Sequence, residues 1–169
     1  MTFFTPPTTM KAKRDMGTIN INDKAPSFTL ANTDKSMVSL DDYAGRKLVI
    51  AFFPAVFTGV CTNEMCTLTE GLANFEALGA SVVGISVDSL FANGAFAKAE
   101  GIGFPLLSDH TRSTISDYGV TFENFGAEGY TAATRSVFIV NEEGNVTYKW
   151  LAPNPGVEPD YDAIKAALA

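Results

Sequence analysis

Two cysteines, Cys61 and Cys66, are the side chains best suited to covalent chemistry, and they are the only cysteines in the 169-residue chain. Six apolar residues from Leu48 to Phe53 precede them, Pro54 ends this run, and Thr58 is placed to open a helix. The first turn of a helix favours a thiolate, because N–H groups without a helical acceptor and the positive end of the helix dipole face it. We therefore predict a reactive thiolate at Cys61.

Thr58 and Pro54 would shape the surroundings of this thiol. The Thr58 hydroxyl is expected to cap the helix, or to donate a hydrogen bond to the thiolate or to a bound oxygen. Pro54 has no backbone N–H, and it is expected to pack over the sulfur and limit the access of water. Simpler interpretations stay open for the single residues, with Cys61 as a core cysteine and Thr58 as a plain N-cap. Neither interpretation explains why a strand end, Pro54, Thr58 and Cys61 occur together in this order.

The spacing between Cys61 and Cys66 limits how the two thiols can meet. On an intact helix they lie about 140° apart around the axis and roughly 8–9 Å apart at Cα, whereas a disulfide needs Cα atoms within about 4.4–6.8 Å. Either Cys66 is a bystander, or the first helical turns unwind to let it reach Cys61. Cys66 shares its face with Thr62, Thr69 and Glu70, away from the apolar stripe, and is expected to be more accessible than a core cysteine.

The cysteine spacing argues against two other uses of the pair. C-x4-C is not a standard zinc spacing, and the only histidine, His110, falls in a distant predicted loop. The pair is also not C-x-x-C, which disfavours disulfide exchange of the thioredoxin type. We expect neither a metal nor an organic cofactor.

Buried strands and helices alternate around these thiols. The unbroken apolar run over 48–53 is typical of a strand covered on both faces of a sheet, and 81–87 and 136–140 are predicted to be two further buried strands. A helix is expected to start near Thr58 and to carry one apolar stripe as far as Phe75, before Gly79 ends it. The element order predicts an α/β domain with a central mixed sheet, an N-terminal β-hairpin on one edge and flanking helices.

Turn and capping residues bound the other expected elements. Asp88 and Ser89 are placed to cap a helix that Gly101 closes. Residues 121–134 show no hydrophobic period, so they are predicted to be a loop. The remaining predictions are a hairpin over 25–30 and 37–40, helices over 90–100, 111–118 and 160–168, a short strand over 104–107 and a half-exposed strand over 146–150.

Composition narrows the class of protein. The chain is 46% hydrophobic with a net charge of −7, which argues against a nucleic-acid partner, because phosphate binding relies on clustered Lys and Arg. No apolar run approaches the ~20 residues of a membrane helix, so no membrane partner is expected. Residues 1–17 are predicted to be a flexible extension without a secretory signal, followed by one domain over 18–169, and a cytoplasmic location is expected.

Several segments resemble the peroxiredoxin family. P-A-V-F-T-G-V-C, from Pro54 to Cys61, is similar to the family's active-site motif P-x-x-x-T-x-x-C. A-T-R-S-V-F-I-V, which contains Arg135, matches the family's arginine at the start of a late strand, and A-P-S-F-T-L and P-L-L-S-D-H also look like family segments. The resemblance spans about 19–168. It implies a thioredoxin-like fold with an N-terminal hairpin, and a thiol-dependent peroxidase as the activity.

The resemblance also implies roles for single residues. Cys61 would be the peroxidatic cysteine, which a hydroperoxide converts to a sulfenic acid. Arg135 would favour the thiolate and hold a peroxide oxygen, and Thr58 would hydrogen-bond the same oxygens. Pro54 would shield the sulfenic acid, and Glu64 matches an acidic position that orients the arginine. The simpler alternatives are a first-turn helix acid for Glu64 and a surface charge at a strand end for Arg135.

The position of Cys66 differs from that of the second cysteine in the commonest two-cysteine peroxiredoxins, which lies near the C-terminus. This sequence has no cysteine there. The chain matches either a subfamily in which Cys66 resolves Cys61 or a one-cysteine type. A thioredoxin, a glutaredoxin or a low-molecular-weight thiol would then be the reductant, and a homodimer or larger homo-oligomer is expected. Two rival functions stay open: a hydrolase using Cys61 and His110, and a thioredoxin-fold holdase or redox-sensing module.

Overall fold

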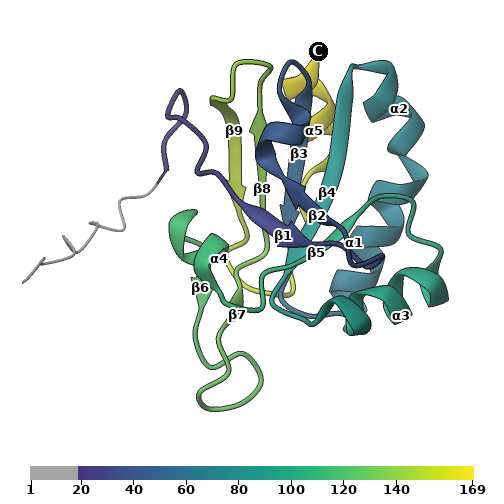
Figure 1. Ribbon diagram of the computed structural model, residues 1–169, viewed down its shortest axis with the longest axis vertical. Coiled ribbons are helices and arrows are strands. Elements are labelled where there is room, and N and C mark those ends of the chain that lie inside the picture. Colours follow the sequence, from purple (N-terminus) through teal and green to yellow (C-terminus); the bar gives the residue numbers. More distant parts are fainter. Residues whose placement is uncertain (1–18) are drawn as a thin grey trace, which may run out of the picture.

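The computed structural model describes residues 19–169, so the predicted extension over 1–17 lies outside the described residues. A seven-stranded sheet forms the centre, in the order β2-β1-β5-β4-β3-β8-β9 (Figure 1). Its strands are β1 (Thr29–Ala31), β2 (Met37–Ser39), β3 (Lys47–Phe52), β4 (Ala80–Ser86), β5 (Leu106–Ser108), β8 (Ser136–Val140) and β9 (Val146–Leu151). Strands β3, β4 and β5 are parallel, whereas β8 and β9 are antiparallel to their neighbours and the β1–β2 hairpin lies at the edge. The predicted α/β class with a mixed sheet is confirmed.

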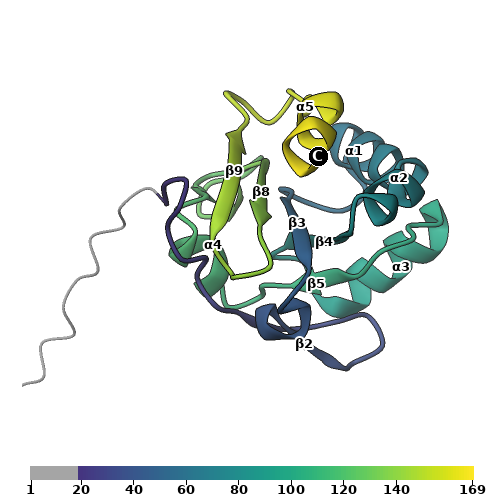
Figure 2. The same cartoon turned by 90° about the horizontal axis from the view of Figure 1, so that it is seen from above.

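Two hydrophobic cores lie on opposite faces of this sheet. Successive residues of β3 supply them in turn: Val49 and Ala51 point into one core, and Ile50 and Phe52 into the other. This arrangement explains the unbroken apolar run, because both faces of the strand are covered. Helices α1 (Gly59–Glu70), α2 (Leu72–Ala77), α3 (Leu90–Glu100) and α5 (Tyr161–Leu168) supply the first core, and α4 (Ser113–Asp117) packs against the second (Figure 2).

The helix expected to run without a break to Phe75 is in fact two helices, and that prediction was wrong. Gly71 separates α1 from α2 and is the C-cap of α1. Glycine is a poor helix former, and a Cβ on Gly71 would lie only 3.3 Å from the ring of Phe75. The predicted stop at Gly79 is confirmed by its positive φ of 75°.

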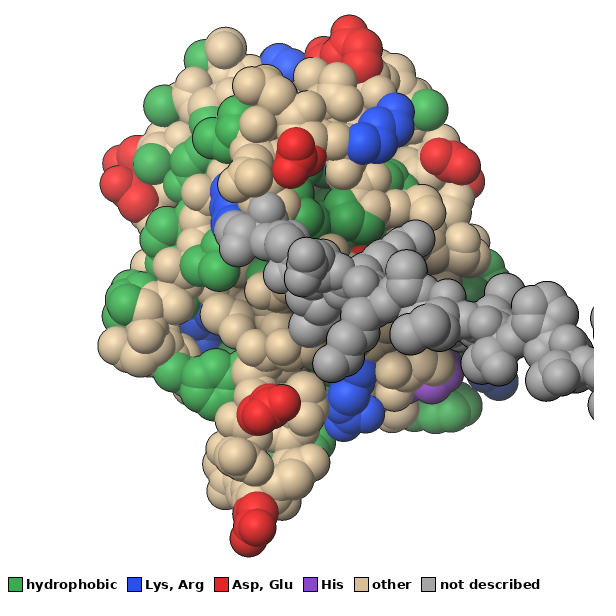
Figure 3. Space-filling model, turned by 90° about the vertical axis from the view of Figure 1, so that its left-hand side faces the viewer, with side chains coloured by type: hydrophobic (Ala, Val, Ile, Leu, Met, Phe, Trp, Pro, Cys, Tyr) green, Lys and Arg blue, Asp and Glu red, His purple; other side chains and the backbone are tan. Residues whose placement is uncertain are grey.

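Residues 121–134 are not wholly a loop, contrary to the prediction. Strands β6 (Thr121–Phe122) and β7 (Ala132–Ala133) pair antiparallel and form a second, two-stranded sheet. Two alanines carry little strand preference, so the sequence offered only a weak signal. The hairpin projects from the body of the protein, with acidic side chains at its tip (Figure 3).

The predicted cap of α3 agrees with the structure. The Ser89 hydroxyl accepts a hydrogen bond from the N–H of Ala92 at 3.1 Å, and Gly101 closes α3 in the left-handed conformation. Asp160 caps α5 through the N–H of Ala163 at 3.0 Å. A 3-10 helix covers Leu40–Tyr43. Among residues 19–169, no helix is both long enough and apolar enough to cross a membrane.

Candidate active site

The thiol of Cys61 lies just after the loop that connects a central strand to a helix. Strand β3 ends at Phe52, Pro54 is buried, and α1 begins at Gly59 after an extended N-cap at Thr58. Cys61 is therefore in the first turn of α1, where its N–H has no acceptor within the helix. Its side chain is fully buried, as the core-cysteine interpretation expected, but it also has a charged neighbour.

That neighbour is Arg135, whose Nη2 lies 3.3 Å from the Cys61 sulfur. The pairing of β3 with β8 explains the contact, because Phe52 faces Ser136 and so places Arg135 beside the end of β3. Arg135 is only 2% exposed, so its interpretation as a surface charge was wrong. A buried guanidinium directed at the sulfur supplies it with both a positive charge and an N–H donor.

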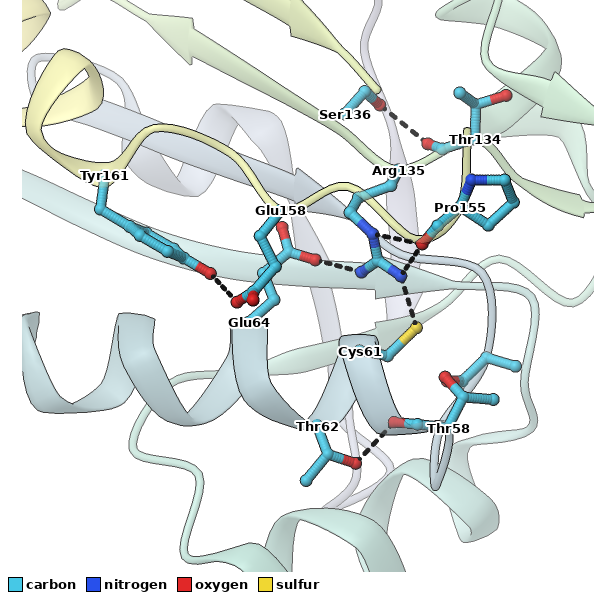
Figure 4. Close-up of polar contacts among 11 residues, drawn as sticks. Thr58, Cys61, Thr62, Glu64, Thr134, Arg135, Ser136, Pro155, Glu158 and Tyr161 are labelled. Carbon is cyan, nitrogen blue, oxygen red and sulfur yellow. Dashed lines mark hydrogen bonds and ion pairs between the residues drawn. The ribbon is translucent and has the colours of Figure 1, made fainter. Parts of the chain in front are cut away.

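Glu64 holds the other end of the guanidinium. Its Oε2 lies 2.5 Å from Nη1 of Arg135, and its side chain is fully buried (Figure 4). Glu64 lies beyond the first turn of α1, so its interpretation as a first-turn acid was wrong. Burial raises the pKa of Glu64, and the charge of Arg135 opposes that rise. Burial disfavours the charge of Arg135, but Glu64 and Cys61 together raise its pKa above the ordinary value.

A backbone carbonyl, which no sequence motif indicates, completes the arginine site. The C=O of Pro155 accepts hydrogen bonds from Nε of Arg135 at 3.2 Å and from Nη2 at 2.9 Å. The loop reaches this place because β9 pairs with β8, and the N–H of Ala152 donates to the C=O of Arg135 at 2.9 Å. A carbonyl has no residue-type signature, so only the strand order could have indicated it.

Thr58 lies at the helix start as predicted, but its hydroxyl does not cap the helix. The hydroxyl donates to the C=O of Ala55 at 2.9 Å instead. A hydroxyl has one proton, so in this arrangement the Thr58 oxygen can only accept a hydrogen bond from a further partner. The C=O of Thr58 accepts from both the N–H and the hydroxyl of Thr62, which secures the first turn.

Cys66 and His110 lie apart from this group. The Cys66 sulfur is half-buried on the outer face of α1, as expected, and lies 4.0 Å from Oε2 of Glu100. Both cysteines are free thiols. His110 is exposed, and none of the described contacts joins it to Cys61. Within residues 19–169, no three His, Cys, Asp or Glu side chains gather as a metal site would require.

The arrangement suits nucleophilic attack on a small molecule that bears oxygen. A buried sulfur and a guanidinium meet at one end of the sheet, and a threonine oxygen lies on the loop before the helix (Figure 4). The sulfur can supply electrons, and the N–H donors can stabilise negative charge that develops on an oxygen.

Comparisons with known proteins agree with this chemistry. Residues 21–149 match the AhpC/TSA family. A thiol peroxidase from Corynebacterium glutamicum is 41% identical over 149 residues, which cover 88% of each chain. The crystal structure of a peroxiredoxin-like protein from Aquifex aeolicus is similar with a TM-score of 0.81 and 27% identity, covering 90% of this chain and 87% of that one. Peroxiredoxin Q from Xanthomonas campestris is 30% identical with a TM-score of 0.74, covering 83% of this chain and 89% of that one.

Proposed function

The chain belongs to the AhpC/TSA family and is a thiol-dependent peroxidase with a thioredoxin-like fold, and we propose that it reduces hydroperoxides through a sulfenic acid on Cys61. The observation that carries this proposal is the contact of 3.3 Å between Nη2 of Arg135 and the buried sulfur. We assign it a part in antioxidant defence, with one catalytic domain over 18–169 and residues 1–17 as an extension.

The first chemical step transfers one oxygen atom to sulfur. The Cys61 thiolate attacks the terminal oxygen of a hydroperoxide, so that an S–O bond forms while the O–O bond breaks. The sulfur loses two electrons, and the oxygen that leaves takes a proton and departs as water or an alcohol. Arg135 and the N–H of Cys61 stabilise the negative charge that moves onto the oxygens during the attack.

The residues around the sulfur have distinct parts in this step. Thr58, whose own proton is held by Ala55, accepts the hydrogen bond of the incoming O–H group. Glu64 keeps the guanidinium in place, and Pro54 limits the access of water and of further peroxide to the sulfenic acid. None of these groups requires a cofactor, because the electrons come from sulfur.

A second thiol must then remove the sulfenic acid. We assign this resolving part to Cys66, whose thiol condenses with the sulfenic acid to give a disulfide and water. An external reductant of the thioredoxin, glutaredoxin or low-molecular-weight thiol type then restores both thiols with two electrons and two protons. The cytoplasm is the expected compartment because it keeps thiols reduced, and a homodimer or larger homo-oligomer is the proposed assembly.

Stopped-flow fluorescence of Trp150, the only tryptophan, tests the peroxidase step on mixing reduced protein with hydrogen peroxide. We expect a fast signal and rapid loss of one thiol, and Cys61→Ser should abolish both. Arg135→Lys should slow the reaction about 100-fold or more, since a lysine cannot hold the same fork of hydrogen bonds. Arg112→Lys is the matched control. Thiol loss no faster than for free cysteine would overturn the proposal, and loss of turnover in His110→Ala would support a hydrolase instead.

A further inference from the structure

The peptide group between Ala55 and Val56 is held from both sides in the loop that leads to the reactive cysteine. On one side, the N–H of Val56 donates to Oδ2 of Asp88 at 3.0 Å. On the other side, the C=O of Ala55 accepts the Thr58 hydroxyl proton at 2.9 Å. The Asp88 carboxylate and the Thr58 hydroxyl are therefore linked through a single peptide plane.

Asp88 is itself fixed to the sheet. The hydroxyl of Ser86, the last residue of β4, donates to the same Oδ2 at 2.8 Å, and the N–H of Asp88 lies 3.3 Å from that hydroxyl oxygen. The hydroxyl of Ser108, at the end of β5, donates to the C=O of Asp88 at 2.6 Å. Both serines are buried. Asp88 is thus attached to β4 through its carboxylate and to β5 through its backbone carbonyl, and it has little freedom to follow the loop.

The loop needs such an anchor because its own conformation is strained. Phe57, between Val56 and Thr58, has a φ of 61°, which is unfavourable for a bulky side chain. Its ring is 58% exposed but meets the buried ring of Phe96 in α3 edge to face, at 5.3 Å between centroids. The two contacts that hold this loop, from Asp88 to Val56 and from Phe96 to Phe57, therefore both come from the segment that runs from the end of β4 into α3.

We propose that Asp88 is a positioning residue for peroxide reduction, which orients the Ala55–Val56 peptide and, through it, the Thr58 hydroxyl. The inference rests on the proposed function. Without the carboxylate, the peptide can rotate and Thr58 loses the fixed acceptor of its proton. The hydroxyl then no longer presents its oxygen in one direction to the peroxide. The thiolate of Cys61 keeps its own contacts with Arg135 and the helix.

Two reactions of the Cys61 sulfur distinguish a loss of peroxide positioning from a general loosening of the loop. Peroxide needs an oriented oxygen site, whereas alkylation by iodoacetamide needs only an accessible thiolate. Both rate constants are measured in a Cys66→Ser background, so that only Cys61 reacts. The variants are Asp88→Ala, Asp88→Asn and Ser86→Ala. Ser89→Ala is the matched control, because it removes a cap of α3 beside Asp88 but no contact with the loop.

Asp88→Ala is expected to slow the reaction with hydrogen peroxide about 10- to 100-fold, which is the range for losing a hydrogen bond to a charged group. Alkylation should not slow, because the thiolate keeps its contact with Arg135 and a buried sulfur can only become more accessible when the loop loosens. Asp88→Asn should recover most of the peroxide rate, since its amide oxygen still accepts the N–H of Val56. Ser86→Ala should give a smaller but equally selective loss, and Ser89→Ala none.

Coupling with Thr58 provides a further criterion. In a Thr58→Val background, Asp88→Ala should cost much less than it does alone, because both substitutions remove the same oriented oxygen. Parallel losses of alkylation and peroxide rates, full additivity with Thr58→Val, or an equal loss in Ser89→Ala would overturn the inference. If Asp88→Ala does not fold, Ser86→Ala provides the test. A Ser86→Ala effect that slows alkylation as much as peroxide reduction would then overturn the inference. A slow wild-type reaction would contradict the proposed function instead.

Discussion

Glu64 is a fully buried carboxyl, and its ionisation therefore affects both stability and the arginine beside it. Burial raises its pKa to about 7, while Arg135 limits the rise. A carboxyl whose pKa is higher in the folded than in the unfolded protein contributes stability below the unfolded value, here 4.5, and loses that contribution as the pH rises through the folded value.

The wild-type protein should therefore become less stable relative to Glu64→Gln as the pH is raised from about 4.5 to about 8. The expected change in the difference is on the order of 1–3 kcal/mol. Urea unfolding of both proteins under reducing conditions at several pH values measures it, and the other titrating groups cancel in the comparison. Parallel stability curves would contradict the assignment of the raised pKa.

Cys66 is also an unusual titrating group, for a different reason. Partial burial raises the pKa of its thiol, and the carboxylates of Glu100 and Glu70 raise it further. In a Cys61→Ser variant, alkylation of Cys66 should be slower than that of a free cysteine at neutral pH and should accelerate through a midpoint above the ordinary one. Glu100→Gln should lower that midpoint. Glu76→Gln, at an exposed position on α2, should leave it unchanged, and an equal shift there would refute the assignment.

At the scale of elements, the packing of α1 on the sheet depends on a glycine in β4. A Cβ on Gly84 would lie 2.6 Å from Cδ2 of Leu106 and 3.3 Å from the sulfur of Met65. These neighbours are buried and cannot move away freely. Gly84→Ala should therefore lower the free energy of unfolding by about 1–3 kcal/mol.

Gly94→Ala serves as the opposite control. Gly94 lies inside α3, and its nearest neighbour to a new Cβ is Thr33 at 3.6 Å, which is an ordinary contact. The substitution should stabilise the protein by up to about 1 kcal/mol, because alanine favours helix. Denaturant midpoints report both changes, and the same sign for the two variants would contradict the packing argument.

Helix α1 also has to change if Cys66 resolves Cys61, since the geometry of an intact helix keeps the two residues too far apart. Oxidation with one equivalent of peroxide should then produce a Cys61–Cys66 disulfide in mass spectra and a loss of helical circular dichroism. Cys66→Ser should show neither change. A persistent sulfenic acid, or a disulfide between two chains, in the wild-type protein would count against the resolving part of Cys66.

For the molecule as a whole, the sequence predicted what local chemistry determines. The run from Leu48 to Phe53 lies in a central strand, and the cap at Ser89 starts α3, because the signals for these features are contained in a few neighbouring residues. The burial of Arg135 could not be predicted from its neighbours in the sequence. It depends on the pairing of β3 with β8, which joins residues far apart in the sequence.

The missed contributions to the site share this dependence on distant pairing. Pro155 acts through a carbonyl, and Asp88 acts on the backbone of Val56, so neither leaves a spacing motif. The hydroxyl of Thr58 was expected at the helix N–H groups or at the sulfur, yet it bonds to the C=O of Ala55. The choice among such hydrogen-bond partners follows from loop conformation, which the residue types alone do not determine.

The contacts that fix the Arg135 guanidinium have a consequence for a substrate as small as a hydroperoxide. All three guanidinium nitrogens meet Glu64, Pro155 or the sulfur of Cys61, which are parts of the protein itself. An arginine side chain has about 2 kcal/mol of rotamer entropy to lose on becoming ordered, and here that loss occurs during folding. A ligand with two oxygen atoms offers too few contacts to immobilise such a side chain. The enzyme can therefore use weak binding and still meet the transition state with its donors in place.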